Sequence, residues 1–510
     1  MAVPQVMLAG SRARARPAIS ASGAHSCSLQ NGHAYCWGDD GYGELGDGTT
    51  NSSAGPVAVD TRGVLAGKTL TQISAGNSFD TCALDSAGAA YCWGNNVNGQ
   101  LGDGTTTSSD VPVAVATRGV LAGKTLTQIS AGYNGTCALD TAGAAYCWGG
   151  NFSGELGDGT TTSSAVPVAV ATSGVLARKT LIQISAGTIH ACAVDRAGAA
   201  YCWGGNASGQ LGNPAAGDSA VPVAVATRGV LAGKTLTQIS AGYHQTCALD
   251  TAGAAYCWGN DFFGQLGNGT NTSSTVPVAV ATSGALAGQA LAQISTNFFQ
   301  TCAVSRAGAA YCWGGNPDGE LGDGTTTDSN VPVAVDTSGV LAGKTMTQIS
   351  AGDDNTCAQD SAGADHCWGS NLSGELGDGL TIVQSSVPVA VDSLAPQPPG
   401  GVAARAGSAS ALVSWTAPVS LGTGTLTGYA AIARPGGRFC ATRNVHSCTI
   451  EGLRNGTTYS VTVVAWTTAG TSAPSIAVII TPRPAPPHAS PPSPQMAAPT
   501  PQASHRHSGR

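Results

Sequence analysis

Short apolar runs separated by Gly-rich and Thr-rich stretches recur along the chain with a period of 55 residues. In the second copy they lie at 70–74, 81–84, 90–93 and 111–115. Runs of four or five residues bounded by Gly, Asn and Asp predict β-strands. One such unit cannot bury both faces of its sheet alone, so the seven copies at 19–392 predict an all-β fold, a seven-bladed β-propeller.

The fourth strand of every copy contains a proline, such as Pro112 in the second copy. Proline lacks the backbone N–H that a central strand donates to its neighbour, so we expect this strand at the outer edge of its blade.

Each copy also carries a cysteine pair on its second and third strands. The turn at 85–89 fits a three-residue hairpin loop that places Cys82 opposite Cys92 on a non-hydrogen-bonded site, where α-carbons approach to about 4.5 Å. In the first copy Cys27 and Cys36 are one residue closer together, but the two-residue turn Asn31-Gly32 restores the register. We therefore predict disulfides, rather than free thiols or zinc ligands, for the pairs Cys27–Cys36, Cys82–Cys92, Cys137–Cys147, Cys192–Cys202, Cys247–Cys257, Cys302–Cys312 and Cys357–Cys367.

Sixteen cysteines in regular pairs indicate an oxidising compartment, and hence an extracellular or cell-surface location. The first 20 residues contain no apolar core of a signal peptide. We expect residues 1–18 to be a degraded repeat or an N-terminal extension, and the start of the chain to be misassigned or its true N-terminus to be lost.

Composition narrows the range of partners. The net charge of -7, the pI of about 5.6 and scattered Lys and Arg argue against nucleic acid, and no apolar run is long enough to span a membrane. We expect a monomer. A chain rich in Ala, Gly and Pro also suits a bacterial source.

The run Trp-Gly-Asn-Asn-Val-Asn-Gly-Gln-Leu-Gly-Asp-Gly-Thr at 93–105, with its equivalents in the other six copies, resembles the repeat of the regulator of chromosome condensation family. The resemblance implies a seven-bladed propeller with the first strand of each blade innermost. It implies no single activity, because that family includes a nucleotide exchange factor for a small GTPase, ubiquitin-ligase modules and secreted β-lactamase inhibitors.

After a linker at 393–399, residues 400–483 resemble a fibronectin type III domain. Trp415 resembles that domain's core Trp, and the stretch 453–463 resembles its tyrosine corner and the following strand. Cys440 and Cys448 flank a short loop and are expected to form an eighth disulfide. We interpret the domain as a spacer or a weak adhesion module and predict a disordered tail at 484–510.

Differences between nearly identical copies mark positions that the fold does not dictate. The copies differ most after the first strand, and again between the third and fourth strands at 40–42, 97, 152, 206–207, 262–263, 317–318 and 372. In an antiparallel meander both connections emerge on one face, and six of the seven Phe residues lie in them. Exposed aromatic side chains are typical of binding surfaces. The predicted partner-binding residues are Tyr42, Phe79, Asp80, Tyr133, Asn134, Phe152, Ile189, His190, Tyr243, His244, Phe262, Phe263, Phe298, Phe299, Asp353 and Asp354.

The alternative for some of these residues is that they fold inward, plug the channel or pack between blades. By contrast, the Tyr and Trp residues that recur in the repeats, such as Tyr91 and Trp93, are expected in the core.

Catalytic motifs are absent from the repeats. We find no metal-ligand spacing, Walker loop or Gly-x-Ser-x-Gly elbow, and predict no catalytic residue, cofactor or metal site. The repeated Gly-Asp-Gly-Thr sequence, as at 46–49, is better explained as a turn in which Asp bonds nearby backbone than as a calcium loop.

The sequence thus predicts a non-enzymatic, extracellular binding protein whose aromatic-rich loop face contacts an unidentified protein or cell-surface glycan. β-Lactamase inhibition would be one specific form of that role. One alternative is a secreted polysaccharide hydrolase or its accessory subunit, with Asp353 and Asp354 as the acid and base. A regulator similar to a guanine nucleotide exchange factor follows from the family resemblance alone.

Overall fold

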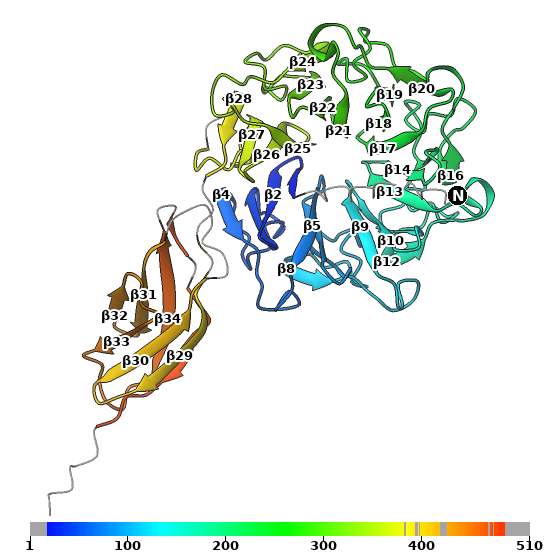
Figure 1. Ribbon diagram of the computed structural model, residues 1–510. Coiled ribbons are helices and arrows are strands. Elements are labelled where there is room, and N and C mark those ends of the chain that lie inside the picture. Colours follow the sequence, from blue (N-terminus) through cyan, green and yellow to red (C-terminus); the bar gives the residue numbers. More distant parts are fainter. Residues whose placement is uncertain are drawn as a thin grey trace, which may run out of the picture. The chain divides into compact units, whose positions relative to one another are not determined.

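The computed structural model describes residues 18–381, 384–392, 396, 398–418, 426–467, 470–472 and 474–484. They form two compact units. In the first unit seven four-stranded antiparallel sheets surround a common axis as propeller blades, which confirms the predicted all-β fold (Figure 1). The predictions of a degraded repeat at 1–18 and a disordered tail at 484–510 concern segments that lie, apart from Ala18 and Pro484, outside the described residues.

Every blade takes four consecutive strands, which we call A to D in chain order. Blade 1 is β1 (Ile19–Ala21), β2 (His25–Gln30), β3 (His33–Gly38) and β4 (Ser53–Ala58). Blade 2 is β5 (Leu70–Gly76), β6 (Asp80–Asp85), β7 (Ala90–Gly94) and β8 (Ser109–Ala114). Blade 3 is β9 (Leu126–Ala131), β10 (Gly135–Asp140), β11 (Ala145–Gly149) and β12 (Ser164–Ala169). Blade 4 is β13 (Leu181–Ala186), β14 (His190–Asp195), β15 (Ala200–Gly204) and β16 (Ser219–Ala224).

Blade 5 is β17 (Leu236–Ala241), β18 (Gln245–Asp250), β19 (Ala255–Gly259) and β20 (Ser274–Ala279). Blade 6 is β21 (Leu291–Thr296), β22 (Gln300–Ser305), β23 (Ala310–Gly314) and β24 (Ser329–Ala334). Blade 7 is β25 (Met346–Ala351), β26 (Asn355–Asp360), β27 (Asp365–Ser370) and β28 (Gln384–Ala390). Short 3-10 helices η1 (Gly174–Leu176), η2 (Gly229–Leu231) and η3 (Gly284–Leu286) lie in three of the D–A connections.

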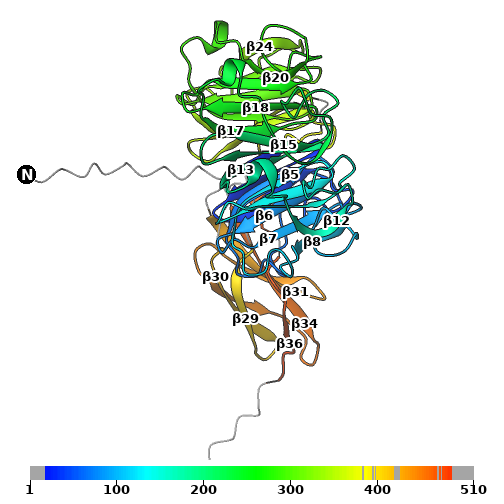
Figure 2. The ribbon, with the colours of Figure 1, turned by 90° about the vertical axis from the view of Figure 1, so that its right-hand side faces the viewer.

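Strand A is innermost and strand D outermost, as expected. The A strands of neighbouring blades contact one another, for example β5 with β9 and β13 with β17, whereas each D strand pairs only with its C strand. Seen edge-on, the propeller carries its connections on two opposite faces (Figure 2).

The predicted strand register and disulfides are confirmed. Leu84 pairs with Ala90 and Cys82 with Cys92, and in blade 1 the positive φ angles of Asn31 and Gly32 form the short turn that keeps Cys27 opposite Cys36. In all seven blades the paired cysteines form a disulfide with α-carbons 4.1 Å apart. All sixteen cysteines of the chain are paired, a pattern typical of proteins from oxidising compartments.

The hydrophobic core lies between the blades. One cluster, for example, joins Cys82, Leu84 and Leu101 of blade 2 to Ile129 and Trp148 of blade 3. The indole Nε1 of each repeat Trp donates a hydrogen bond of 2.7–3.0 Å to a backbone carbonyl in the C–D loop of the adjacent blade; these residues are Trp37, Trp93, Trp148, Trp203, Trp258, Trp313 and Trp368. The repeated Tyr residues, such as Tyr91, are also buried, so the predicted core role of both residue types is confirmed.

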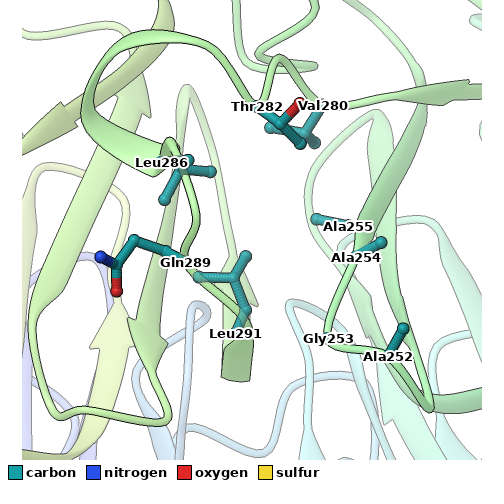
Figure 3. Close-up of a pocket in the computed structure, with 9 residues that line it drawn as sticks. All are labelled: Ala252, Gly253, Ala254, Ala255, Val280, Thr282, Leu286, Gln289 and Leu291. Atoms are coloured by element: carbon teal, nitrogen blue, oxygen red, sulfur yellow. The ribbon is translucent and has the colours of Figure 1, made fainter.

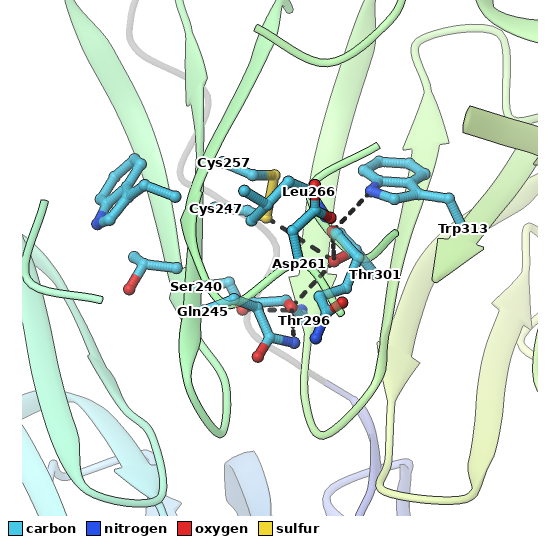
Figure 4. The surroundings of a disulfide bond; sticks show 12 residues. Ser240, Gln245, Cys247, Cys257, Asp261, Leu266, Thr296, Thr301 and Trp313 are labelled. Atoms are coloured by element: carbon cyan, nitrogen blue, oxygen red, sulfur yellow. Dashed lines mark hydrogen bonds between the residues drawn. A yellow bond between two sulfur atoms is a disulfide. The ribbon is translucent and has the colours of Figure 1, made fainter. Parts of the chain in front are cut away.

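The junction of blades 5 and 6 shows how the disulfide lies beside this network. Trp313 Nε1 and Thr301 Oγ1 both donate to the carbonyl oxygen of Gln265, at 3.0 Å each (Figure 4). Thr301 Oγ1 also lies 3.8 Å from the Sγ of Cys247, which is bonded to Cys257. A bridged hairpin in one blade therefore packs directly on the first residues of strand B in the next.

The ring closes without a strand shared between its ends, because blades 1 and 7 each consist of four consecutive strands. The backbone N–H of Ala21 donates to Ser350 Oγ at 3.0 Å, and Trp37 Nε1 donates to the Glu375 carbonyl at 2.8 Å. The same hydrogen bonds join other neighbouring blades, as between Ala75 N–H and Ser20 Oγ. Blades 7 and 1 are therefore joined by the same hydrogen bonds as other neighbouring blades.

The second unit contains β29 (Gly400–Ala406), β30 (Ser410–Thr416), β31 (Leu426–Arg434), β32 (Arg438–Thr442), β33 (Ser447–Glu451), β34 (Tyr459–Thr467), β35 (Gly470–Thr471) and β36 (Val478–Ile480). Trp415 lies in its core, and the Arg454 backbone N–H donates to Tyr459 Oη at 2.9 Å, which confirms the tyrosine corner. Cys440 and Cys448 form the eighth disulfide. Within the described residues, no helix has the length and apolar character that crossing a membrane requires.

Candidate functional site

The A–B and C–D loops emerge on the same face of the propeller, as predicted. We call this the variable face. Its A–B loops are 22–24, 77–79, 132–134, 187–189, 242–244, 297–299 and 352–354, and its C–D loops are 39–52, 95–108, 150–163, 205–218, 260–273, 315–328 and, in the described part of blade 7, 371–381. The C–D loop of one blade contacts the A–B loop of the next. The rings of Tyr42 and Phe79 lie 5.5 Å apart, and Asn98 Nδ2 donates to Asn134 Oδ1 at 3.0 Å.

Two predicted contact residues are not available to a partner. Asp80 and His190 are each only 1% exposed, because they are the first residues of β6 and β14 and pair with Gly94 and Gly204 inside the blade. His190 Nε2 bonds Thr246 Oγ1 at 2.8 Å, and burial lowers its pKa to about 3. The prediction of Asp80 and His190 as binding residues is therefore wrong.

The two errors have different origins. Blade 2 has one more residue than blade 3 between strand A and its first cysteine, so Phe79, not Asp80, is equivalent to Asn134. Blade 4 has the same spacing as blade 3, and there His190 is equivalent to Gly135, the first residue of strand B, so Ile189 is the last loop residue.

The other predicted residues remain at the surface. Tyr133 is exposed, and half-buried positions are held by Phe79, Asn134, Ile189, Tyr243, His244, Phe263, Phe298, Phe299, Asp353 and Asp354. Tyr42 is 46% exposed, Phe152 66% and Phe262 73%. Phe152 and Phe262 share one position at the tip of the C–D loop with Val97, Ala207, Pro317 and Leu372. Val97 and Leu372 are as exposed as the two Phe residues, and the strict 55-residue spacing could have identified them as contact candidates.

Five aromatic side chains form a continuous strip at the junction of blades 5 and 6. Tyr243 and Phe298 have ring centroids 4.3 Å apart, and Phe298 lies 4.1 Å from Phe299. The strip continues from Phe299 to Phe263 at 4.6 Å and from Phe263 to Phe262 at 5.0 Å. It therefore runs from the inner A–B loops to the exposed tip of a C–D loop, with the tilted and edge-on ring arrangements that aromatic pairs prefer.

An acidic cluster lies at the next junction, between blades 6 and 7. Carboxylate oxygens of Asp318, Glu320 and Asp354 all lie within 4.8 Å of one another. Burial and the neighbouring carboxylates raise the pKa of Glu320 to about 8, and burial and Asp318 raise the pKa of Asp354. Next to it, burial and Asp354 raise the pKa of Asp353 to about 7. Among the described residues these three oxygens are the group best arranged for a hard cation, although the predicted absence of a metal site stays a prediction.

Some residues of the variable face do turn toward the axis. Asn77 of blade 2 reaches past blade 1 and hydrogen-bonds both Asn297 of blade 6 and Asp353 of blade 7. The inward alternative therefore holds for Asp353. Packing between blades holds in part for the aromatic strip, because Phe263 and Tyr243 of blade 5 contact Phe299 and Phe298 of blade 6, whereas Phe262 stays exposed. Asp353 and Asp354 consequently face different partners, although they are adjacent in sequence.

The repeated Gly-Asp-Gly-Thr sequence forms the predicted turn. Asp47 Oδ1 accepts the Thr49 backbone N–H at 2.8 Å, and Asp103 Oδ1 accepts that of Thr105 at 2.9 Å. The carboxylates are used by local backbone, which accounts for the motif without calcium.

The opposite face, built from B–C turns and D–A connections, has a different character. All Lys and Arg residues between 18 and 392 lie in B–C turns or D–A connections: Arg62, Lys68, Arg118, Lys124, Arg178, Lys179, Arg196, Arg228, Lys234, Arg306 and Lys344. They are scattered along the sequence, as expected, but none lies in an A–B or C–D loop, although the Arg62 side chain reaches the C–D loop of its own blade at Gly48. Five of these Lys residues pair with an Asp at the end of strand B, as Lys68 does with Asp85 at 3.3 Å.

Small cavities also occur on the opposite face. One of about 120 Å³ is lined by residues 252–255, Val280, Thr282, Leu286, Gln289 and Leu291 (Figure 3). An equivalent cavity of about 90 Å³ lies two blades earlier, with Lys179 in place of Gln289. Their recurrence at the same place in the repeat identifies them as a feature of the fold.

Three family models match parts of the chain between residues 31 and 481. Residues 63–413 match the RCC1-like domain, 31–84 the regulator of chromosome condensation (RCC1) repeat, and 396–481 the fibronectin type III domain. The ultraviolet-B receptor UVR8 of Arabidopsis thaliana is 32% identical over 313 residues, which are 61% of this chain and 67% of that protein. The E3 ubiquitin-protein ligase HERC2 of Homo sapiens is 28% identical over 332 residues, or 64% of this chain, but the match spans only 6% of the ligase.

Solved structures share the fold. Human WBSCR16 has 20% sequence identity and a TM-score of 0.61, with 72% of this chain and 96% of that chain covered. Prp20p from Saccharomyces cerevisiae has 21% identity and a TM-score of 0.60, with 72% and 87% covered. At these identities the likeness concerns the fold alone.

Proposed function

Because the chain belongs to the RCC1-like domain family and is similar to proteins as different by name as an ultraviolet-B receptor and an E3 ubiquitin-protein ligase, we propose its function from its own surface. The function is non-enzymatic binding of a protein or glycan partner by the variable face. The observation that supports it is the aromatic strip, which ends at Phe262, the most exposed Phe of the propeller at 73%.

The exposure of Phe262 favours this function over a purely structural role for the aromatic strip. A Phe that only fills a core contributes through buried area, whereas Phe262 leaves most of its ring in water. Large aromatic side chains at solvent-exposed loop tips are typical of contact hot spots. The eight disulfides support an extracellular or cell-surface location for this binding.

The test uses the full chain and two single variants. Wild-type protein, Phe262→Ala and Val230→Ala would be immobilised and exposed to culture medium and cell-wall fractions of the producing organism. Val230 is a half-exposed apolar residue on the opposite face, 38% exposed, and serves as the control. We expect a partner that binds wild type and Val230→Ala and binds Phe262→Ala about tenfold more weakly, as for a hot-spot residue.

Equal capture by all three proteins would contradict the proposal. Release of reducing sugar from chitin or cellulose, lost on Asp354→Asn, would instead favour the hydrolase alternative.

A further inference from the structure

The loops of the variable face contain no Lys or Arg at all; their charged residues are Asp and Glu only. Those carboxylates include Asp39, Asp47, Asp103, Asp158, Asp318, Asp323, Asp353, Asp354 and Asp378. Every Lys and Arg of the propeller lies in a B–C turn or a D–A connection, where the five Lys are held by Asp partners and Arg62 by Asp60. The A–B and C–D loops at the junctions of blades 5, 6 and 7 therefore present a negative field that attracts cations and repels anions.

The aromatic strip and the acidic cluster share one loop of blade 6. A Cβ added to Gly315, at the start of this C–D loop, would lie 2.8 Å from the Cβ of Phe299, so the loop packs directly against the strip. Three and five residues later, Asp318 and Glu320 of the same loop reach Asp354. Aromatic faces and carboxylates are thus placed beside each other with no basic side chain between them.

We propose that the partner bound by the variable face is a basic peptide segment, whose Lys or Arg side chains lie on the aromatic strip and pair with Asp318 and Asp354. This inference rests on the proposed binding function and names the chemistry of the partner. Guanidinium and ammonium groups are attracted both by the faces of aromatic rings and by carboxylates. A neutral glycan would stack on the rings and donate hydroxyl hydrogen bonds to the carboxylates but has no charge to pair with them, so the negative field favours a cationic ligand.

The experiment is a fluorescence anisotropy titration of the full chain with two labelled peptides. One contains Lys, Arg and Gly; in the other, Gln replaces each Lys and Arg. We expect the basic peptide to bind and the Gln peptide not to bind, and we expect the affinity to fall as salt is raised. A soluble chitin oligosaccharide serves as the glycan probe.

Three variants locate the contact. Asp318→Asn combined with Asp354→Asn, which keeps the size of both side chains, should weaken binding of the basic peptide at least about tenfold, and Phe262→Ala should weaken it severalfold. Asp336→Asn, on the opposite face, should leave it unchanged. Thermal unfolding of each variant shows whether the fold is retained.

The outcomes separate this inference from the proposed function. Equal binding of both peptides, salt-independent binding, or unchanged binding by the double Asn variant would overturn the cationic ligand. If the oligosaccharide binds instead and Phe262→Ala weakens it, the binding face stands and the basic partner is wrong.

Discussion

Asn77, in the A–B loop of blade 2, donates a hydrogen bond of 2.8 Å to Asp353, which lies 276 residues later in the A–B loop of blade 7. Both residues depart from the repeat: Asn77 belongs to the one A–B loop with an extra residue, and the equivalents of Asp353 include Tyr133 and Tyr243. Their common neighbour Asn297 stands where five of the other copies have Gly and blade 1 has Ser22. Three single-copy departures thus meet near the axis and tie together blades 2, 6 and 7.

We predict that Asn77→Ala lowers the free energy of unfolding by about 1 kcal/mol, because Asp353 and Asn297 both lose a hydrogen-bond partner. Urea denaturation followed by Trp fluorescence measures the change. Asn98→Ala is the matched control on the same face, since Asn98 makes one such bond, to Asn134. An equal effect of the two substitutions would argue against a special role for the Asn77 contact.

The repeat could be predicted well because its rules are local. The number of residues in the B–C turn sets which residues face each other across the hairpin, so Cys82 and Cys92 could be paired from turn length alone. The same holds for the outer position of strand D, which follows from Pro112. Each of these inferences needs only one blade.

Features that depend on several blades could not be predicted in the same way. The Asn77–Asp353 bond requires the spacing of A–B loops around the axis, which no single repeat contains. The burial of Asp80 depends on which loop residue begins strand B, and one extra residue in the loop shifts that assignment. The charge separation could have been found by sorting Lys68 and its equivalents by connection type rather than by position along the chain.

The propeller disulfides are predicted to contribute to stability individually. Replacing both Cys247 and Cys257 by Ala should lower the free energy of unfolding of the propeller by about 3 kcal/mol on the chain-entropy estimate for a loop of this length. Denaturant unfolding measures it. The same replacement of Cys440 and Cys448 is the control and should leave the propeller transition unchanged, because that disulfide belongs to the other unit. More than a few free thiols in denatured, unreduced wild-type protein would contradict the disulfide assignment.

Glu320 should make the stability depend on pH. Its pKa is raised to about 8 in the folded protein, whereas a Glu in the unfolded chain titrates near its ordinary value of 4.5. Between these values only the unfolded chain loses the proton, so this group's contribution to stability falls as the pH rises from about 4.5 to about 8. Gln100, Gln210 and Gln265 occupy the same position in other blades and accept the same backbone N–H.

We therefore expect Glu320→Gln to match wild type at pH 4.5 and to exceed it at pH 8 by more than about 1 kcal/mol, since one pKa unit corresponds to about 1.4 kcal/mol. Urea denaturation at the two pH values measures the difference. A stability difference that is the same at both pH values would show that Glu320 does not hold its proton as proposed.

Blade 6 offers a test of the Lys–Asp pairs of the opposite face. It has Gln289 and Ser305 where blade 2 has Lys68 and Asp85. Although burial opposes it, hydrogen bonds from the backbone N–H groups of Ala89 and Ala87, from Lys68 and from Tyr91 Oη lower the pKa of Asp85. In blade 6 the Ser305 Oγ accepts the Ala309 backbone N–H at 3.1 Å.

The double variant Gln289→Lys with Ser305→Asp should therefore have a free energy of unfolding about 1 kcal/mol above that of wild type at pH 7. The coupling energy between the two substitutions should be below about 1 kcal/mol, because the equivalent Lys68 is partly exposed. An Asp with a lowered pKa stabilises the fold above its unfolded pKa near 3.9, and this gain is lost as the pH falls through the folded pKa. A double-mutant cycle at pH 7 and again at pH 3 measures both effects. Ser305→Asp could instead destabilise the protein at pH 7 without being restored by Gln289→Lys. In that case an Asp at 305 would not make the stabilising hydrogen bonds that Asp85 makes, and the B–C turns of blades 2 and 6 would not be equivalent.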